Sequence, residues 1–117
     1  MDKLHRVLEV LNKKLAEQIR IIDMRQACSY TDYFVIVTAK NPRHLMSLLS
    51  DVEKELSLFP GDFHREGQAE SSWLLLDAKD FLVHFFLEES RNQFRLEALW
   101  ADQPSYSLED YFSCDQS

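Results

Sequence analysis

The chain contains few side chains whose types and spacing suit chemistry. Asp77 and Asp80 form a pair of carboxylates, and two acids side by side on one strand can hold Mg²⁺ for phosphoryl transfer. Here the two flank a short turn, where an aspartate commonly bonds its own backbone, so we interpret Asp80 as a turn residue. Gly61 and Gly67 each stand alone, so the chain has no glycine-rich phosphate-binding loop. Neither a dinucleotide site nor a P-loop is predicted.

The histidines and cysteines form no metal-ligand pattern. None of the four histidines lies four residues from another, or close to a cysteine at zinc-ligand spacing. Cys28 and Cys114 are too few and too far apart for a disulfide framework, and Cys28 lacks a local nucleophile signature. His84 alternates within an apolar run, which predicts a hydrogen-bonded histidine in the core or on a sheet face. We therefore predict no enzymatic activity, no cofactor and no metal ion.

Charge is distributed unevenly along the 117 residues, whose net charge is −7. Residues 1–58 carry nine basic and eight acidic side chains, whereas residues 59–117 carry four basic and twelve acidic ones. Such an acidic half repels nucleic-acid phosphates and favours a basic protein surface as its partner. The alternative is that the acidity only keeps a small domain in solution. DNA is not an expected partner.

Length and composition predict one domain. Apolar residues make up 45% of the chain, enough for a single core. No apolar run reaches the ~18 residues that cross a bilayer, and charged residues occupy the N-terminal stretch where a signal peptide would be apolar. We expect a cytoplasmic protein without membrane contact.

The first half of the chain predicts a helix, two strands and a second helix. Apolar side chains recur at helical spacing at Leu4, Val7, Leu8, Leu11 and Leu15. Asp2 is the expected N-cap of this helix. Residues 19–23 and 33–38 are β-branched or apolar and predict an antiparallel pair of strands, the second buried on both faces. Asn41 and Pro42 then suit a helix start, and apolar spacing continues to Leu56.

The second half predicts three more strands and a helix. Residues 62–66 form a short strand, which after a right-handed crossover is expected to lie parallel to 33–38. Residues 73–77 and 81–87 predict a hairpin. Ser90 and Gln93 suit a capping box for a helix that runs to about Trp100 and stops before Pro104. The acidic, aromatic tail over 105–117 is either docked or disordered, and periodicity does not decide.

The expected fold is therefore a single α/β (α+β) domain. Its order is α-β-β-α-β-β-β-α, with a mixed sheet of about five strands and flanking helices over residues 1–104, followed by the tail.

Four further residues suggest contact with a partner. Arg43 and His44 begin a helix, where positive charge opposes the helix dipole, so they are either tolerated surface residues or functional ones. Trp73 opens a strand and Trp100 ends a helix; tryptophans at such positions are either lids of the core or binding hot spots.

Taken together, many of these residues occur in the order typical of one family. The chain resembles the Iojap family, the ribosomal silencing factors, from about residue 4 to residue 104. The residues that carry the resemblance are Asp23, Ser29, Asp32 to Ile36, Arg43-His44, Glu66-Gly67, Trp73, Leu76-Asp77, Asp80, Val83-His84, Arg91 and Leu96 to Trp100.

The resemblance implies a nucleotidyltransferase-like fold without the metal-binding acids, and a protein that is not an enzyme. It further implies binding to the large ribosomal subunit through a basic ribosomal protein of the L-fourteen family, which blocks joining of the small subunit and lowers translation when nutrients are short. It also implies a homodimer when the protein is free, with no small-molecule substrate.

The leading hypothesis is thus a binding module that inhibits subunit association. Its expected partner-binding residues are Trp73, Asp77, Asp80, His84, Arg91, Arg43 and His44. One alternative is a degenerate nucleotidyltransferase or hydrolase that still binds nucleotides in a pocket with converging carboxylates. Another is a dimeric scaffold whose aromatic tail reaches the second subunit.

Overall fold

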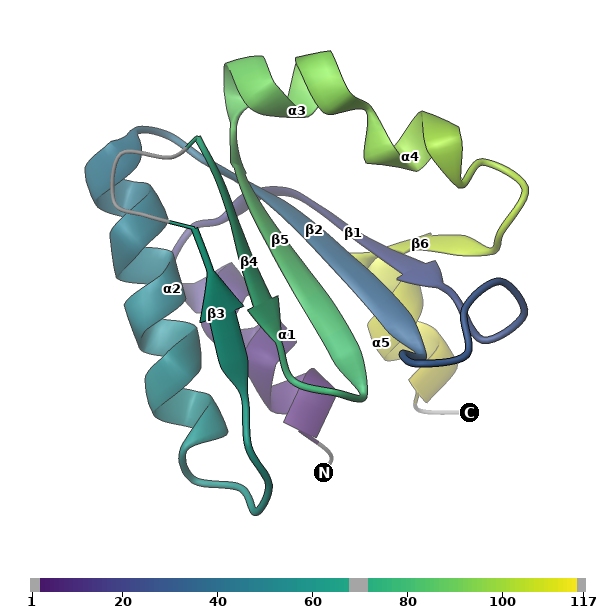
Figure 1. The fold of residues 1–117 in the computed structure, drawn as a ribbon, viewed down its shortest axis with the longest axis horizontal. Helices are drawn as coiled ribbons and strands as arrows, with labels where there is room; N and C mark the ends of the chain where they lie inside the picture. Colours follow the sequence, from purple (N-terminus) through teal and green to yellow (C-terminus); the bar gives the residue numbers. More distant parts are fainter. Residues whose placement is uncertain (1–2, 68–71, 116–117) are drawn as a thin grey trace.

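The computed structural model describes residues 3–67 and 72–115, and in these a mixed six-stranded sheet is flanked by helices (Figure 1). The predicted N-cap Asp2 lies outside the described residues. The strand order across the sheet is β3-β4-β5-β2-β1-β6. Along the chain, the elements are α1 (Lys3–Lys13), β1 (Glu17–Asp23), β2 (Tyr33–Ala39), α2 (Pro42–Leu56), β3 (His64–Glu66), β4 (Trp73–Asp77), β5 (Phe81–Leu87), α3 (Glu88–Phe94), α4 (Leu96–Leu99), β6 (Ser105–Ser107) and α5 (Leu108–Asp115). The predicted single mixed α+β domain is confirmed.

The centre of the sheet is a parallel pair, β2 and β5, each with an apolar side chain on both faces. The predicted antiparallel pairing of β1 with β2 and the predicted hairpin of β4 with β5 are both present. The expected parallel pairing of residues 62–66 with β2 is wrong, because β3 lies at the sheet edge, antiparallel to β4. The three residues of β3 are all exposed, whereas the apolar β5 gains far more burial beside β2.

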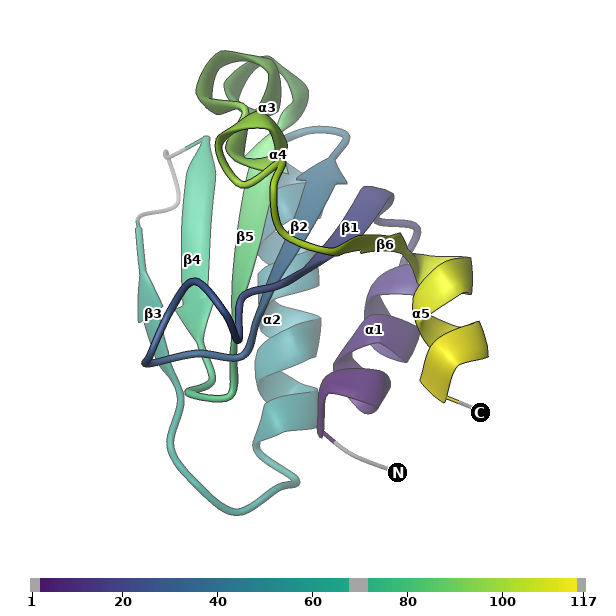
Figure 2. The same ribbon diagram turned by 90° about the vertical axis from the view of Figure 1, so that its right-hand side faces the viewer.

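Helices α1 and α2 form one layer on the sheet, together with α5 (Figure 2). The start of α2 is as predicted: Asn41 accepts a hydrogen bond from the backbone N–H of His44 at 2.8 Å, and Pro42 occupies the first turn. Leu15 was expected on the buried face of α1, but the helix ends at Lys13 and Leu15 is 64% exposed. Leu15 has a φ of 66°, in the left-handed turn that leads into β1.

The segment after β5 differs from the single capped helix that was predicted. Helix α3 already begins at Glu88, and its N-cap position is Leu87, which makes no side-chain cap. The hydroxyl of Ser90 instead bonds the hydroxyl of Ser72. Arg95 has a left-handed φ of 50° and separates α3 from the one-turn α4. The two short helices form an arm beyond the end of the sheet (Figure 1).

The tail is docked. Strand β6 pairs antiparallel with β1, and α5 follows it onto the helical layer. The ring of Tyr111 meets that of Tyr33 edge-on at 6.2 Å, and the ring of Phe112 lies 4.7 Å from that of His5. The sixth strand of the sheet therefore comes from the tail.

Candidate functional site

The two faces of the sheet are covered differently. One face packs against α1 and α2, while the other carries a smaller apolar cluster under α4 and the loop over residues 24–32 (Figure 2). The buried members of this smaller cluster are Ile22, Met24, Phe34, Ile36, Leu82 and Phe86. Its outer, half-buried members are Cys28, Trp73, Leu75, Leu96 and Trp100, and we call this surface the aromatic face.

Trp73 is held in place by two rings beneath it. Because side chains alternate along a strand, Trp73 of β4 shares this face with His84 and Phe86 of β5. The indole N–H of Trp73 donates to Nδ1 of His84 at 3.2 Å, and its ring stacks on Phe86 at 5.2 Å. Trp73 is therefore both packed and half-exposed, as a tryptophan in a binding surface often is.

His84 lies beneath Trp73 and is only 5% exposed. Burial lowers its pKa to about 4, so the imidazole is neutral at pH 7. Since Nδ1 accepts the hydrogen bond from Trp73, the proton is on Nε2, and in the described residues Nε2 has no hydrogen-bond partner. The predicted hydrogen-bonded histidine in the core is confirmed, and its role here is to orient Trp73.

Arg91 fixes the arm against the sheet. Its guanidinium donates to the Thr38 hydroxyl at 2.9 Å, to the Gln18 carbonyl, and to the Glu97 carboxylate at 2.9 Å. The side chain is 7% exposed, and burial lowers the pKa of this guanidinium. The Nε and Nη1 donors of Arg91 are bonded within the chain, which gives it a structural role beside the aromatic face, and its contact with a partner stays a prediction.

The rim of the aromatic face combines an exposed ring and an acid. Tyr30, from the loop over residues 24–32, is 69% exposed. Asp77, at the end of β4, accepts a hydrogen bond from the backbone N–H of Lys79 at 2.8 Å. Thus Asp77 bonds the turn, a role predicted for Asp80. Hydrogen bonding with the Cys28 side chain raises the pKa of the Tyr30 phenol, so these two side chains meet at the rim.

Asp80, Arg43 and His44 lie elsewhere. Asp80 is exposed at the β4–β5 turn, 3.6 Å from the ammonium of Lys3. Arg43 is exposed in the first turn of α2. His44 accepts from the backbone N–H of Lys40 at 2.9 Å, and its Nε2 is 3.0 Å from the Lys14 carbonyl. His44 therefore links the end of α1 to the start of α2 and lies outside the aromatic face.

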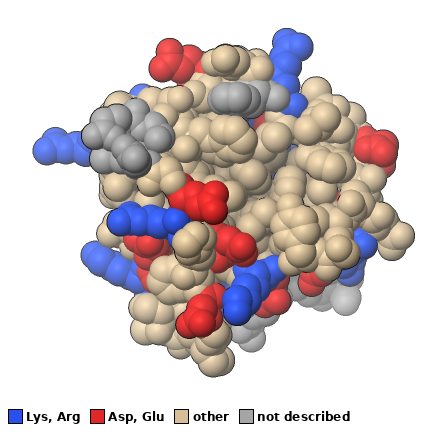
Figure 3. All heavy atoms as spheres, in the orientation of Figure 1, with Lys and Arg blue, Asp and Glu red and all other residues tan. Residues whose placement is uncertain are grey.

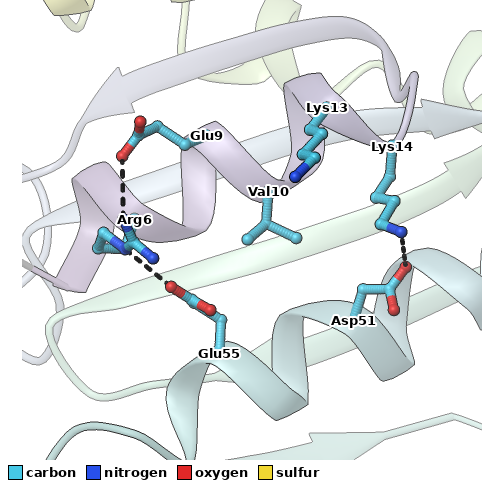
Figure 4. Close-up of a pocket in the computed structure, with 7 residues that line it drawn as sticks. All are labelled: Arg6, Glu9, Val10, Lys13, Lys14, Asp51 and Glu55. Carbon is cyan, nitrogen blue, oxygen red and sulfur yellow. Dashed lines mark hydrogen bonds and ion pairs between the residues drawn. The ribbon is translucent and has the colours of Figure 1, made fainter.

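A charged groove runs between α1 and α2 in the helical layer (Figure 4). Its volume is about 350 Å³, and opposite charges on its walls are already paired. Arg6 bonds Glu55 at 2.8 Å, and Lys14 lies 4.0 Å from Asp51. These side chains satisfy each other, so the groove offers little unbalanced charge to a ligand.

A second hollow, of about 490 Å³, lies at the carboxyl ends of β2 and β5, where nucleotides bind in many α/β folds. Glu88 and Glu89 line it beside Lys40, and Asn41 already caps the adjacent end of α2. Two carboxylates beside a capped helix end would repel a phosphate. This hollow therefore does not favour the nucleotide-binding alternative.

The side chains of the aromatic face are those of a protein–protein interface and not of a metal site. Within residues 3–67 and 72–115, no three His, Cys, Asp or Glu side chains come together as a metal site. The same residues include no helix that is long and apolar enough to span a bilayer. Figure 3 shows mostly uncharged side chains over the middle of the sheet, while charged ones gather over β3 and the β4–β5 turn and project at the margins of this view. An apolar centre with half-buried tryptophans and charge at its margin is typical of a protein–protein interface.

Sequence reasoning identified Trp73 and His84 but missed several members of this face. Leu75, Leu96 and Cys28 belong to it, although their local patterns indicate only strand, helix or loop. For Leu75, the alternation from Trp73 is a usable signal, because side chains two apart on a strand share a face. For the loop and arm residues, only the tertiary fold brings them to the sheet.

Comparison with known proteins agrees with this geometry. The family model described as "Ribosomal silencing factor during starvation" matches residues 1–117. The ribosomal silencing factor RsfS of Halalkalibacterium halodurans is 27% identical over 113 residues, covering 96% of this chain and 97% of that protein. The Mus musculus protein named mitochondrial assembly of ribosomal large subunit protein 1 is 31% identical and aligns with 80% of this chain, which covers 43% of it. A crystal structure from Chromobacterium violaceum superimposes with a TM-score of 0.79 at 27% identity, over 86% of this chain and 88% of that one.

The fold is a small mixed α+β domain with no metal cluster in its described residues, and the full-length match identifies its family. The chain belongs to the family of ribosomal silencing factors. Membership implies association with the ribosome and a regulatory role, in a family that is not known for enzymes.

Proposed function

We propose that this protein binds the large ribosomal subunit through a basic ribosomal protein of the L-fourteen family and blocks association with the small subunit. The observation that carries the proposal is the family match over residues 1–117, on a chain whose aromatic face has half-buried tryptophans at its surface. The name of the mouse relative connects that protein to the large ribosomal subunit, which supports the choice of subunit.

The mechanism requires no bond to be made or broken. The folded chain measures 38 × 33 × 26 Å, so once bound at the surface where the subunits meet, it excludes the small subunit by its volume. Its effect then depends on its concentration relative to its dissociation constant, and on the competing affinity of the small subunit. Under nutrient limitation, this occupancy lowers translation.

Side chains of the aromatic face contribute to binding in different ways. Trp73 is the anchor, since a half-buried indole on a rigid strand loses little conformational entropy on binding. Asp77, at the rim, and the exposed Asp80 offer negative charge to a basic partner. His84 and Arg91 act from within, by orienting Trp73 and the arm. Arg43 and His44 are further candidates outside this face.

Charge supports a basic partner. The net charge of −7 attracts basic proteins over long range, and ribosomal proteins are basic. The same charge is repelled by ribosomal RNA, which penalises binding in a wrong orientation.

We further propose that the free protein is a cytoplasmic homodimer, a state that sedimentation of the purified chain measures directly.

The test uses purified ribosomal subunits. We expect the full chain to co-sediment with large subunits and not with small ones, and to slow their reassociation in proportion to its concentration. Large subunits that lack the L-fourteen-family protein should neither bind the chain nor respond to it. If subunits reassociate equally fast with the chain in excess, the proposed function is wrong.

A further inference from the structure

Two aspartates lie side by side where the parallel pair begins. The parallel register sets Tyr33 of β2 opposite Phe81 of β5, and the residue before each is an aspartate. The backbone N–H of Asp32 donates to the carbonyl of Asp80 at 2.9 Å, which fixes the two residues next to each other. Both side chains are exposed. This edge of the sheet therefore presents two neighbouring negative charges.

The aspartates border a cavity with aromatic walls. Its volume is about 320 Å³, and its lining includes the rings of Tyr33, Phe81 and Tyr111. Tyr111 comes from α5, so the docked tail completes the wall; in Figure 2, α5 lies beside α1 in the helical layer. Carboxylates beside aromatic faces form the usual environment for an ammonium or guanidinium group.

A cation of the chain itself already lies in this cavity. The ammonium of Lys3 is 3.6 Å from the Asp80 carboxylate, donates to the Ala78 carbonyl at 3.1 Å, and lies 5.9 Å from the centre of the Phe81 ring. On the neighbouring ring of Tyr33, the guanidinium of Arg25 lies 5.4 Å from the ring centre. Lys3 shows how an ammonium is held here. Arg25 is already paired with Asp23 at 2.7 Å, so the carboxylates of Asp23, Asp32 and Asp80 outnumber these two cations and negative charge remains.

We propose that this cavity binds a lysine or arginine side chain of a basic protein partner, and that Lys3 competes with it. The excess carboxylate charge attracts the incoming cation, and the rings cover its alkyl stem. The identity of the partner rests on the proposed function. The cation site itself is a property of the free chain, and it lies at the edge of the sheet and outside the aromatic face.

The first experiment uses small probes on the intact chain. N-acetyl-arginine amide is titrated while NMR follows the signals of Tyr33, Phe81 and Tyr111, with the uncharged isostere N-acetyl-citrulline amide as the control ligand. We expect saturable shifts with arginine amide and none with citrulline amide. Asp32→Asn or Asp80→Asn should weaken binding about threefold to fivefold, as expected for an exposed ion pair. Equal response to the two probes, or no effect of either substitution, would overturn the site.

The second experiment tests the competition. Lys3→Ala should tighten binding of arginine amide about threefold or more, because the internal cation is gone. Lys13→Ala removes the same charge from the same helix but from the wall of the α1–α2 groove, and should leave binding unchanged. If Lys3→Ala weakens binding, or if both variants change it equally, Lys3 is not a competitor.

A parallel measurement separates this site from the proposed function. With large subunits, Lys3→Ala should raise the affinity and Asp80→Asn should lower it, relative to Lys13→Ala. If the chain does not bind large subunits but binds arginine amide, the proposed partner is wrong and the cation site stands. If it binds subunits but not arginine amide, the cation site is wrong and the proposed function stands.

Discussion

The two faces of the sheet bury apolar side chains by different means. On the helical face, long amphipathic helices cover the strands, and charges on their surface pair with each other, as Arg6 does with Glu55. On the aromatic face, a loop, a one-turn helix and half-buried tryptophans do the covering. The first arrangement completes its own interactions, whereas the second leaves rings at the surface. We therefore expect substitutions on the helical face to leave binding unchanged and exposed substitutions on the aromatic face to reduce it, and four predictions test this difference.

The largest effect should come from Arg91, which fixes the arm over the aromatic face. Removing it leaves the buried Thr38 hydroxyl and the Gln18 carbonyl without their donor, and frees the Glu97 carboxylate. We expect Arg91→Ala to lower the free energy of unfolding by about 3–5 kcal/mol, measured by urea denaturation. Arg43→Ala is the matched control at an exposed arginine and should change the free energy of unfolding by less than about 0.5 kcal/mol. Similar values for the two variants would show that the arm is not held by Arg91.

The second effect is a pH dependence from His84. Its pKa is about 4 in the folded chain and 6.5 in the unfolded one, so the unfolded chain binds more protons between these values. Stability is unaffected by this group above pH 6.5 and falls as the pH is lowered toward 4, by about 3 kcal/mol in total. Urea denaturation at several pH values, compared with His84→Phe, isolates the loss, because the variant cannot titrate. Parallel pH profiles of the two proteins would contradict the prediction.

Trp73→Ala should mainly reduce binding. Truncating an aromatic anchor typically costs about 2 kcal/mol or more, so affinity for large subunits should fall about 30-fold, measured by co-sedimentation. Trp73→Phe keeps a ring on Phe86 but loses the hydrogen bond to His84. Its affinity for large subunits should therefore lie between those of the unchanged chain and Trp73→Ala. Circular dichroism verifies that both variants are folded. A folded Trp73→Ala chain that binds normally would remove Trp73 from the site.

The smallest effect belongs to the helical face. Arg6 is about half exposed in its ion pair with Glu55, so Arg6→Ala should lower the free energy of unfolding by less than about 1 kcal/mol. Binding to large subunits should stay unchanged in the same co-sedimentation assay. A loss of binding comparable with that of Trp73→Ala would place the partner on the wrong face of the sheet.

Local patterns in the sequence were sufficient for most elements. The apolar spacing of α2 and its Asn41-Pro42 start predict the helix correctly, because capping and periodicity depend on residues close in the chain. The hairpin of β4 and β5 is likewise a short-range feature. The break at Arg95 was not predicted, since a left-handed arginine has no local signature and is stabilised by the contacts of the arm.

The composition of the candidate site was only partly predictable. Trp73 stands out by residue type, and the alternation around His84 predicts its buried position. Arg91 was named as a candidate through the family resemblance, whereas its burial beside the arm is decided by the tertiary fold. Cys28 and Leu96 join the aromatic face only through long-range packing.

The amino-acid sequence alone determined the class of fold, the helices and strands with strong periodicity, the acidic charge and the family resemblance. Each of these follows from residue types and short spacings. The tertiary structure decided which strands are neighbours, with β3 at one edge of the sheet and β6 at the other. It also decided which face of the sheet keeps tryptophans at its surface. These features depend on competition for burial among segments far apart in the chain, and that competition is settled only when the whole core packs.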